Sequence, residues 1–131
     1  MKTAVIYWSG TGNTEAMANA VAEGAGVSAM QVSAFSDDAA EYEALALGCP
    51  AMGAEELEES EFEPFFADIE GKISGKKIAL FGSYDWGDGE WMRLWADRVK
   101  AAGAEVVGGE GLICNNTPDD DALAKCRELG K

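Results

Sequence analysis

The chain contains no histidine. Because histidine is the commonest general base and the commonest metal ligand, its absence argues against most hydrolytic mechanisms and most zinc sites. Cysteine is also scarce, and Cys49, Cys114 and Cys126 form no CxxC motif that would indicate a metal or dithiol site. An odd number of widely spaced cysteines is typical of a reducing compartment, and we expect these side chains to be small buried apolar groups.

Basic residues are few. Ten lysines and arginines stand against 24 acidic residues, which gives a net charge of −14. Such a chain repels nucleic acid and anionic membrane surfaces, so we expect neither as a partner. No apolar run approaches about 18 residues, and no signal-peptide pattern is present, so we predict a cytoplasmic protein. The negative charge is interpreted either as a solubilising surface or as a docking surface for a basic protein.

Apolar runs alternate with amphipathic segments along the whole chain. The apolar runs predict strands at 2–8, 27–35, 44–48, 76–82 and, as a broken last strand, 105–107 and 111–114. The amphipathic segments predict helices at 14–23, 63–72, 90–102 and 118–129, with a short element starting near Ser36. This alternation predicts one α/β domain over residues 1–131, with an open parallel sheet covered by helices on both faces.

The segment 9–14, SGTGNT, follows the first predicted strand and leads into a helix. The N–H groups and the positive dipole end of such a helix form an anion site, and glycines let the backbone close around a phosphate. A GxGxxG motif is excluded because position 15 is glutamate, and a P-loop is excluded because the segment has no lysine. The segment therefore indicates a phosphate that is held rather than transferred, or a capping turn without a ligand.

Two further loops follow the third and fourth predicted strands, PAMGAEE at 50–56 and GSYDWGDG at 82–89. In an open α/β sheet these loops face the first one, because ligands lie outside the carboxyl ends of the strands. Met52 and Trp86 stand on glycine-bearing loops, where they can cover the two faces of a flat ligand. Trp91 and Trp95 have helical spacing and are predicted to be core, whereas Trp8 is compatible with either role.

Three stretches, YWSGTGNTEAMA, LGCPAMGAEELEESEFEPFF and GKKIALFGSYDWGDGEWM, resemble the short-chain flavodoxins, in particular the clostridial type, and the resemblance runs from end to end. It implies a flavodoxin-like three-layer sandwich with a five-stranded parallel sheet of order 2-1-3-4-5 and helices on both faces. It also implies non-covalently bound FMN, no metal and no enzymatic substrate. The expected role is a low-potential one-electron carrier that cycles between the semiquinone and the hydroquinone.

The resemblance carries specific roles onto this sequence. Ser9, Thr11, Asn13 and Thr14 would bind the 5′-phosphate with Gly10 and Gly12 between them, and Ser83 would add a donor. Met52 and Trp86 would sandwich the isoalloxazine ring, and Glu55 would bond its pyrimidine edge. The Gly53–Ala54 peptide would flip towards flavin N5 and stabilise the semiquinone. The full set of expected cofactor-binding residues is Ser9, Gly10, Thr11, Gly12, Asn13, Thr14, Pro50, Ala51, Met52, Gly53, Ala54, Glu55, Ser83, Tyr84, Asp85, Trp86 and Gly87.

The sequence also leads to expectations about charge near the loops and about binding partners. The acidic residues near these loops would make full reduction unfavourable, while the outer members of the glutamate run 55–63 are expected to be solvated. The implied partners are redox proteins with basic docking surfaces, and the chain is expected to be a monomer. Ala54 and Asp85 depart from the family pattern, and these departures bear on the stability of the semiquinone.

Other classes fit less well. An FMN-dependent NAD(P)H or quinone oxidoreductase of the same fold is the alternative function, although such enzymes are usually longer. A signalling receiver would need acidic residues at the end of the first strand, where this chain has Trp8 and Ser9. A low-molecular-weight phosphatase would need a cysteine and an arginine around its phosphate loop.

Overall fold

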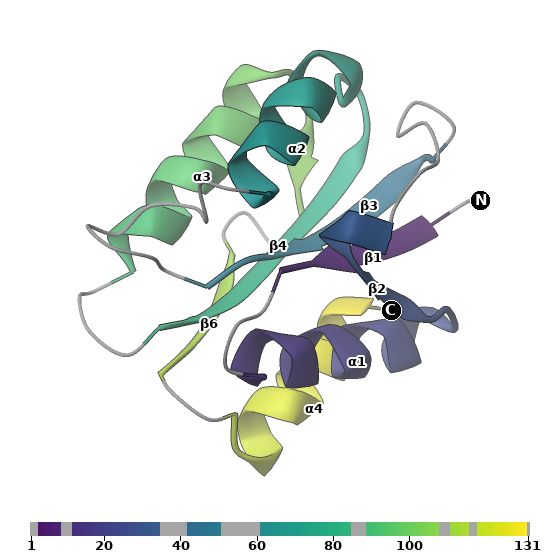
Figure 1. The fold of residues 1–131 in the computed structure, drawn as a ribbon, viewed down its shortest axis with the longest axis vertical. Helices are drawn as coiled ribbons and strands as arrows, with labels where there is room; N and C mark the ends of the chain where they lie inside the picture. Colours follow the sequence, from purple (N-terminus) through teal and green to yellow (C-terminus); the bar gives the residue numbers. More distant parts are fainter. Residues whose placement is uncertain are drawn as a thin grey trace.

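The computed structural model describes residues 3–8, 12–34, 42–50, 61–84, 89–107, 111–115 and 118–130. In these ranges a parallel sheet lies between two layers of helices (Figure 1). The strands are β1 (Thr3–Tyr7), β2 (Ala29–Gln31), β3 (Ala44–Gly48), β4 (Lys77–Tyr84), β5 (Glu105–Val106) and β6 (Leu112–Asn115). The helices are α1 (Asn13–Ala25), α2 (Phe62–Ile69), α3 (Glu90–Ala101) and α4 (Asp120–Gly130), with 3₁₀ turns at Val32–Ala34 and Glu70–Lys72.

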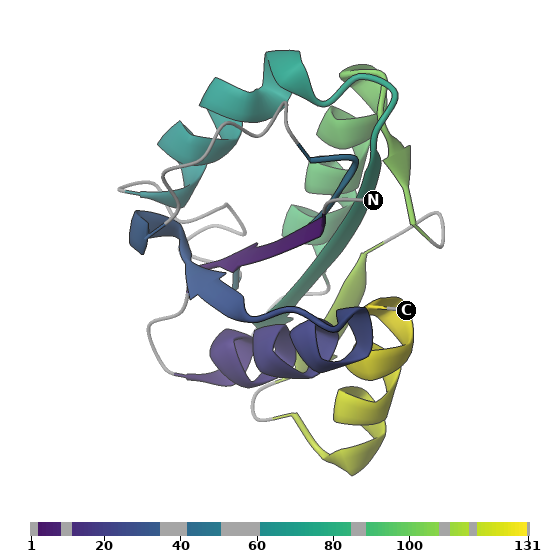
Figure 2. The same ribbon diagram turned by 90° about the vertical axis from the view of Figure 1, so that its right-hand side faces the viewer.

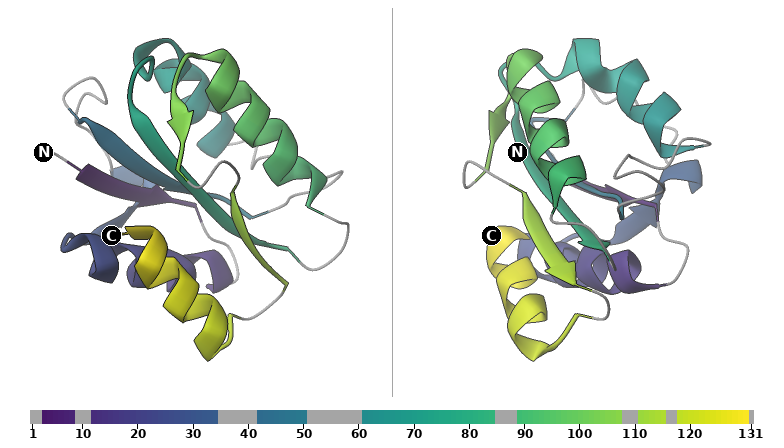
Figure 3. Two further views of the ribbon diagram at one scale, coloured as in Figure 1. Left: turned by 180° about the vertical axis from the view of Figure 1, so that it is seen from behind. Right: turned by 90° about the vertical axis from the view of Figure 1, so that its left-hand side faces the viewer.

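The strand order is β2-β1-β3-β4-β5, and every pairing is parallel, which confirms the predicted topology. The predicted break in the last strand is also confirmed. β5 pairs with Lys77 and Ile78 at the start of β4, whereas β6 pairs with 81–84 at its end (Figure 3). β5 and β6 therefore lie one after the other along the same side of β4.

One predicted strand is too long. The expected strand at 27–35 is confined to Ala29–Gln31, because β2 pairs only with Val5, Ile6 and Tyr7 of β1 before the chain turns into a 3₁₀ segment. An edge strand needs only this short ladder, and its half-buried residues give little pattern to mark its ends. The short element predicted after Ser36 lies outside the described residues.

The two helical layers differ in the side chains they bury. α2 and α3 cover one face of the sheet, and α1 and α4 cover the other (Figure 2). The first layer buries large side chains, including Phe62, Phe66, Trp91 and Trp95, as the helical spacing predicts. The second layer buries mainly small ones, such as Ala18 and Ala22.

Close contact between α1 and α4 depends on two glycines. A Cβ on Gly24 would overlap the carbonyl oxygen of Arg127, and a Cβ on Gly130 would overlap that of Val21. The start of α4 is fixed by Asp119, whose Oδ1 accepts the backbone N–H of Ala122 at 2.8 Å, an N-cap. Within the described residues no helix is long and apolar enough to cross a membrane.

Candidate functional site

The predicted site residues that the structure describes gather at one edge of the sheet. Gly12, Asn13 and Thr14 begin α1 after the end of β1, Pro50 follows the end of β3, and Ser83 and Tyr84 end β4. Because these strands are parallel and adjacent, their carboxyl ends lie side by side. The remaining predicted site residues, Ser9, Gly10, Thr11, Ala51, Met52, Gly53, Ala54, Glu55, Asp85, Trp86 and Gly87, lie outside the described residues.

Thr14 and Ser83 form a buried hydroxyl pair at this edge. They are 1% and 4% exposed, and their side-chain oxygens are 2.9 Å apart. The backbone N–H of Ser83 also donates to Thr14 Oγ1, at 3.3 Å. One of the two hydroxyl hydrogens is used within the pair, so one hydrogen is left for a third group. The pair therefore ties α1 to β4 and keeps one donor for a ligand.

The start of α1 presents backbone donors. Gly12 precedes the helix at φ 95°, a left-handed conformation that suits glycine, and its carbonyl accepts the N–H of Ala16 at 3.0 Å. Within the described part of the chain no side chain caps this helix end. The first N–H groups of a helix have no acceptor within the helix, so this end favours an anion.

A hydrogen bond closes the base of the segment that joins β1 to α1. The hydroxyl of Tyr7, at the end of β1, donates to Glu15 Oε2 in the first turn of α1 at 2.8 Å. Burial of the phenol raises the pKa of Tyr7, and the bond to the Glu15 carboxylate and its charge add to that rise. The bond holds the two ends of the segment together, and sequence reasoning missed it.

The β3–β4 ladder ends in side-chain partners. The last ladder bond runs from the N–H of Cys49 to the carbonyl of Phe81, at 3.1 Å. The next donor in a continued ladder would be the N–H of Ser83, which donates to Thr14. The carbonyl of Cys49 accepts the indole N–H of Trp91 at 3.1 Å. The two strand ends are thus held by α1 on one side and by α3 on the other.

An ion-pair cluster joins α3 to α2. The guanidinium of Arg98 contacts both carboxylate oxygens of Glu63, at 2.6 and 3.0 Å, and those of Glu70 at 3.1 and 3.3 Å. It also lies over the ring of Phe66, 4.7 Å from its centroid. The hydrogen bonds to Glu63 raise the pKa of Arg98 further above its usual range. Glu63, an outer member of the glutamate run 55–63, is partly exposed at the start of α2 and forms in addition an ion pair that the sequence did not predict.

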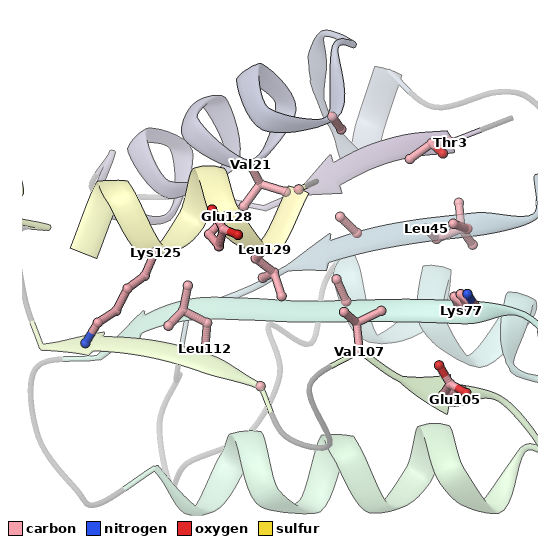
Figure 4. Close-up of a pocket in the computed structure, with 16 residues that line it drawn as sticks. Thr3, Val21, Leu45, Lys77, Glu105, Val107, Leu112, Lys125, Glu128 and Leu129 are labelled. Carbon is pink, nitrogen blue, oxygen red and sulfur yellow. The ribbon is translucent and has the colours of Figure 1, made fainter. Parts of the chain in front are cut away.

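A pocket of about 710 Å³ lies between one face of the sheet and the helices α1 and α4 (Figure 4). Its lining includes Thr3, Ala44 and Lys77, the first residues of β1, β3 and β4. α1 and α4 form its other wall through Val21 and Leu129. None of the predicted site residues that the structure describes lines this pocket.

Comparison with known proteins identifies the family. The family model described as Flavodoxin matches residues 5–130. The chain belongs to the flavodoxin family. It is 50% identical to the flavodoxin of Megasphaera elsdenii, over 97% of this chain and 94% of that protein. It is also 50% identical to the flavodoxin of Clostridium beijerinckii, over 97% of this chain and 95% of that protein.

The fold agrees with this assignment. The solution structure of two-electron reduced M. elsdenii flavodoxin superposes with a TM-score of 0.86 at 46% identity, covering 98% of this chain and 95% of that one. Flavodoxins bind FMN and transfer electrons to redox partners; they are electron-transfer proteins and not enzymes. The function predicted from the sequence is thereby confirmed, and the oxidoreductase alternative is not supported.

The described residues fit a flavodoxin's cofactor. A phosphate monoester needs several hydrogen-bond donors, and the edge offers the N-terminal turn of α1 and the remaining hydrogen of the Thr14–Ser83 pair. Of the residues whose contacts were not predicted from the sequence, only Trp91 has a sequence signal. Its helical spacing marked it as core, but spacing does not show where the indole N–H donates.

Proposed function

We propose that this flavodoxin holds FMN at the carboxyl edge of the sheet and passes single electrons between redox proteins. Thr14, Asn13 and the segment 9–12 bind the 5′-phosphate, with one donor from the Thr14–Ser83 pair. The segments 50–55 and 84–87 hold the isoalloxazine ring, with Met52 and Trp86 on its two faces. Bound FMN supplies the one-electron chemistry, and the chain supplies binding, orientation and charge.

The buried Thr14–Ser83 pair is the observation that carries the phosphate assignment. A hydroxyl hydrogen left over in a buried pair beside a helix N-terminus is well placed for an anion. The two ring segments begin next to each other, because Gly48 pairs with Phe81 in the β3–β4 ladder. FMN bound there would have its phosphate towards α1 and its ring towards β3 and β4.

A two-ligand titration tests this assignment. We expect Thr14→Val to weaken FMN binding by about 10–100-fold, the usual loss for a hydrogen bond to a charged group. Riboflavin has the same ring and no phosphate, so its affinity should stay close to that of the unmodified protein. Thr14→Ser keeps the hydroxyl and should restore FMN binding. Equal losses for both ligands in Thr14→Val would contradict the phosphate assignment.

The charge distribution supports docking to a basic partner. The sequence has no lysine or arginine between Lys2 and Lys72. Several basic residues stand instead near the amino edge of the sheet, including Lys72 at the end of its 3₁₀ turn and Lys77 at the start of β4. We infer that the negative carboxyl edge faces a basic redox protein. The same field should disfavour added negative charge there and keep the potential of the second electron low.

Charge reversals at the two edges test the docking face. Glu90 begins α3 next to the site, whereas Glu105 begins β5 at the opposite edge, and both are exposed. We expect Glu90→Lys to slow electron transfer to a basic c-type cytochrome and to reduce its dependence on salt. The matched variant Glu105→Lys should leave the electron-transfer rate and its salt dependence nearly unchanged. Equal effects would mean that only net charge matters.

We also propose that the protein acts as a monomer in the cytoplasm. No disulfide joins Cys49, Cys114 and Cys126, which is usual in a reducing compartment. The net charge of −14 opposes self-association. Sedimentation at physiological salt should give a single species of about 13.8 kDa.

A further inference from the structure

Two tryptophans one turn apart on α3 occupy similar positions and differ in one contact. Trp91 and Trp95 are 2% and 1% exposed and belong to the same core cluster. The indole N–H of Trp91 donates to the carbonyl of Cys49 at 3.1 Å. The indole N–H of Trp95 is buried and has no hydrogen-bond partner in the described part of the chain. Among the described residues, α3 thus carries one indole donor with a defined acceptor and a matched indole donor without one.

The acceptor lies at the start of one ring segment. Cys49 follows β3 directly and precedes Pro50, whose ring nitrogen carries no hydrogen to extend the ladder. The carbonyl of Cys49 accepts the Trp91 indole N–H one residue after the end of β3 and shortly before residues 51–55. The indole N–H of Trp91 fixes its direction, and with it the direction in which the chain leaves the sheet.

The donor lies at the end of the other ring segment. Trp91 is the second residue of α3, which starts after Gly89 and so directly follows the segment 84–87 and Asp88. Its ring also packs on Tyr84, with the centroids 5.7 Å apart. One side chain thus links the exit of β3, the end of β4 and the start of α3.

Gly82 leaves the space that this contact needs. A Cβ at position 82 would overlap the carbonyl oxygen of Cys49 and would come within 3.1 Å of the Trp91 ring. The strand end is therefore shaped around the bond between Trp91 and Cys49. Such close packing around a buried hydrogen bond leaves the carbonyl few alternative directions.

We propose that Trp91 is a positioning residue for the flavin ring, acting through its hydrogen bond to the carbonyl of Cys49. The inference rests on the proposed function, because the two segments it ties together are those assigned to the ring. Trp91 itself does not need to touch the cofactor. Its loss would let the two segments move relative to each other, so ring affinity and midpoint potential would both change.

The test compares Trp91→Phe with Trp95→Phe. Each substitution removes part of a buried ring, so both should lower the urea midpoint of the apoprotein, and Trp91→Phe should lower it more because it also leaves the carbonyl of Cys49 without its donor. Only Trp91→Phe breaks the bond to Cys49, so it should weaken FMN and riboflavin binding by about tenfold more than Trp95→Phe. It should also shift the midpoint potentials, whereas Trp95→Phe should leave them within error.

A second measurement uses the unmodified protein and does not depend on how a variant folds. If the Trp91 bond favours ring binding, then ring binding must favour the bond to the same extent. Saturation with FMN should therefore slow hydrogen exchange of the Trp91 indole more than that of the Trp95 indole, as followed by NMR. Equal slowing of the two indoles, or equal affinities in the two variants, would overturn the inference. Failure of the unmodified protein to bind FMN would instead overturn the proposed function.

Discussion

The two helical layers of this molecule are packed by different means. The α2–α3 layer is built from aromatic rings that meet edge to face, with Trp95 5.4 Å from Phe62 and 5.9 Å from Phe66, and an arginine cluster covers it. In the α1–α4 layer, two glycines let the helix backbones approach closely. The packing of the α2–α3 layer depends on the volume of its side chains. The packing of α1 against α4 depends on two positions that have no side chain.

The site lies where these layers meet at the carboxyl edge. Thr14 comes from the small-residue layer and binds the end of β4. Trp91 comes from the aromatic layer and binds the end of β3. The comparison therefore separates two kinds of support, one at the proposed phosphate end of the site and one at the proposed ring end.

Removal of a large ring from the aromatic layer should have the largest effect on stability. Phe66 is fully buried, and Phe66→Ala should lower the free energy of unfolding by about 3–5 kcal/mol through lost burial and a cavity. Phe65 is its half-buried neighbour on α2, and Phe65→Ala should cost clearly less. Urea denaturation of both variants measures the difference.

Addition of a methyl group should be the main way to damage the small-residue layer. Gly24→Ala places a Cβ against the backbone of Arg127, and we expect a loss of about 1–3 kcal/mol because one helix must move. Gly71 has open space around it and lies outside this layer, so Gly71→Ala is the control and should be nearly neutral. If both variants unfold at the same urea concentration, the close contact between α1 and α4 does not matter for stability.

The ion-pair cluster should make a smaller, salt-dependent contribution. Arg98 is about one-third exposed, so solvent screens its pairs with Glu63 and Glu70. Arg98→Met should cost about 1 kcal/mol at low salt and less at high salt. Lys100→Met, at an exposed position on the same helix, should cost less at either salt concentration. Thermal unfolding of these variants at two ionic strengths measures the difference. An equal loss for Arg98→Met at both would mean that the cluster contributes through packing and not through charge.

Alkaline pH should also distinguish the two layers. Burial, and then the nearby Cys114, raise the pKa of Cys126 to about 11 in the small-residue layer, and burial also raises that of Tyr7. The folded protein keeps these protons longer than the unfolded chain. The resulting stability is complete below about pH 9 and is lost as the pH rises through about 11. Cys126→Ala should flatten this decline, measured by urea titrations from pH 8.5 upwards, by at most about 1.4 kcal/mol per pH unit.

The sequence predicted elements where the pattern is local. β3 was placed at its observed bounds because an apolar run stops at Cys49-Pro50, and the aromatic face of α3 followed from the four-residue spacing of its tryptophans. β2 was overextended because its edge position gives no sharp pattern. The resemblance indicated Thr14 and Ser83 separately, but their bond joins residues 69 positions apart, and no local pattern encodes such a contact. The pairing of Arg98 with Glu63 and Glu70 was missed for the same reason.

The contact between α1 and α4 also affects how the chain emerges during synthesis. Residues 13–25 pack against residues 120–130, so α1 stays uncovered on one side until the last of these residues is made. Every described residue that supports the site lies at or before Arg98. At 5–20 residues per second, roughly 2–6 s separate the synthesis of Arg98 from that of Gly130. A ribosome-bound chain can therefore contain β1, β3 and β4 while α1 still lacks the cover that α4 provides.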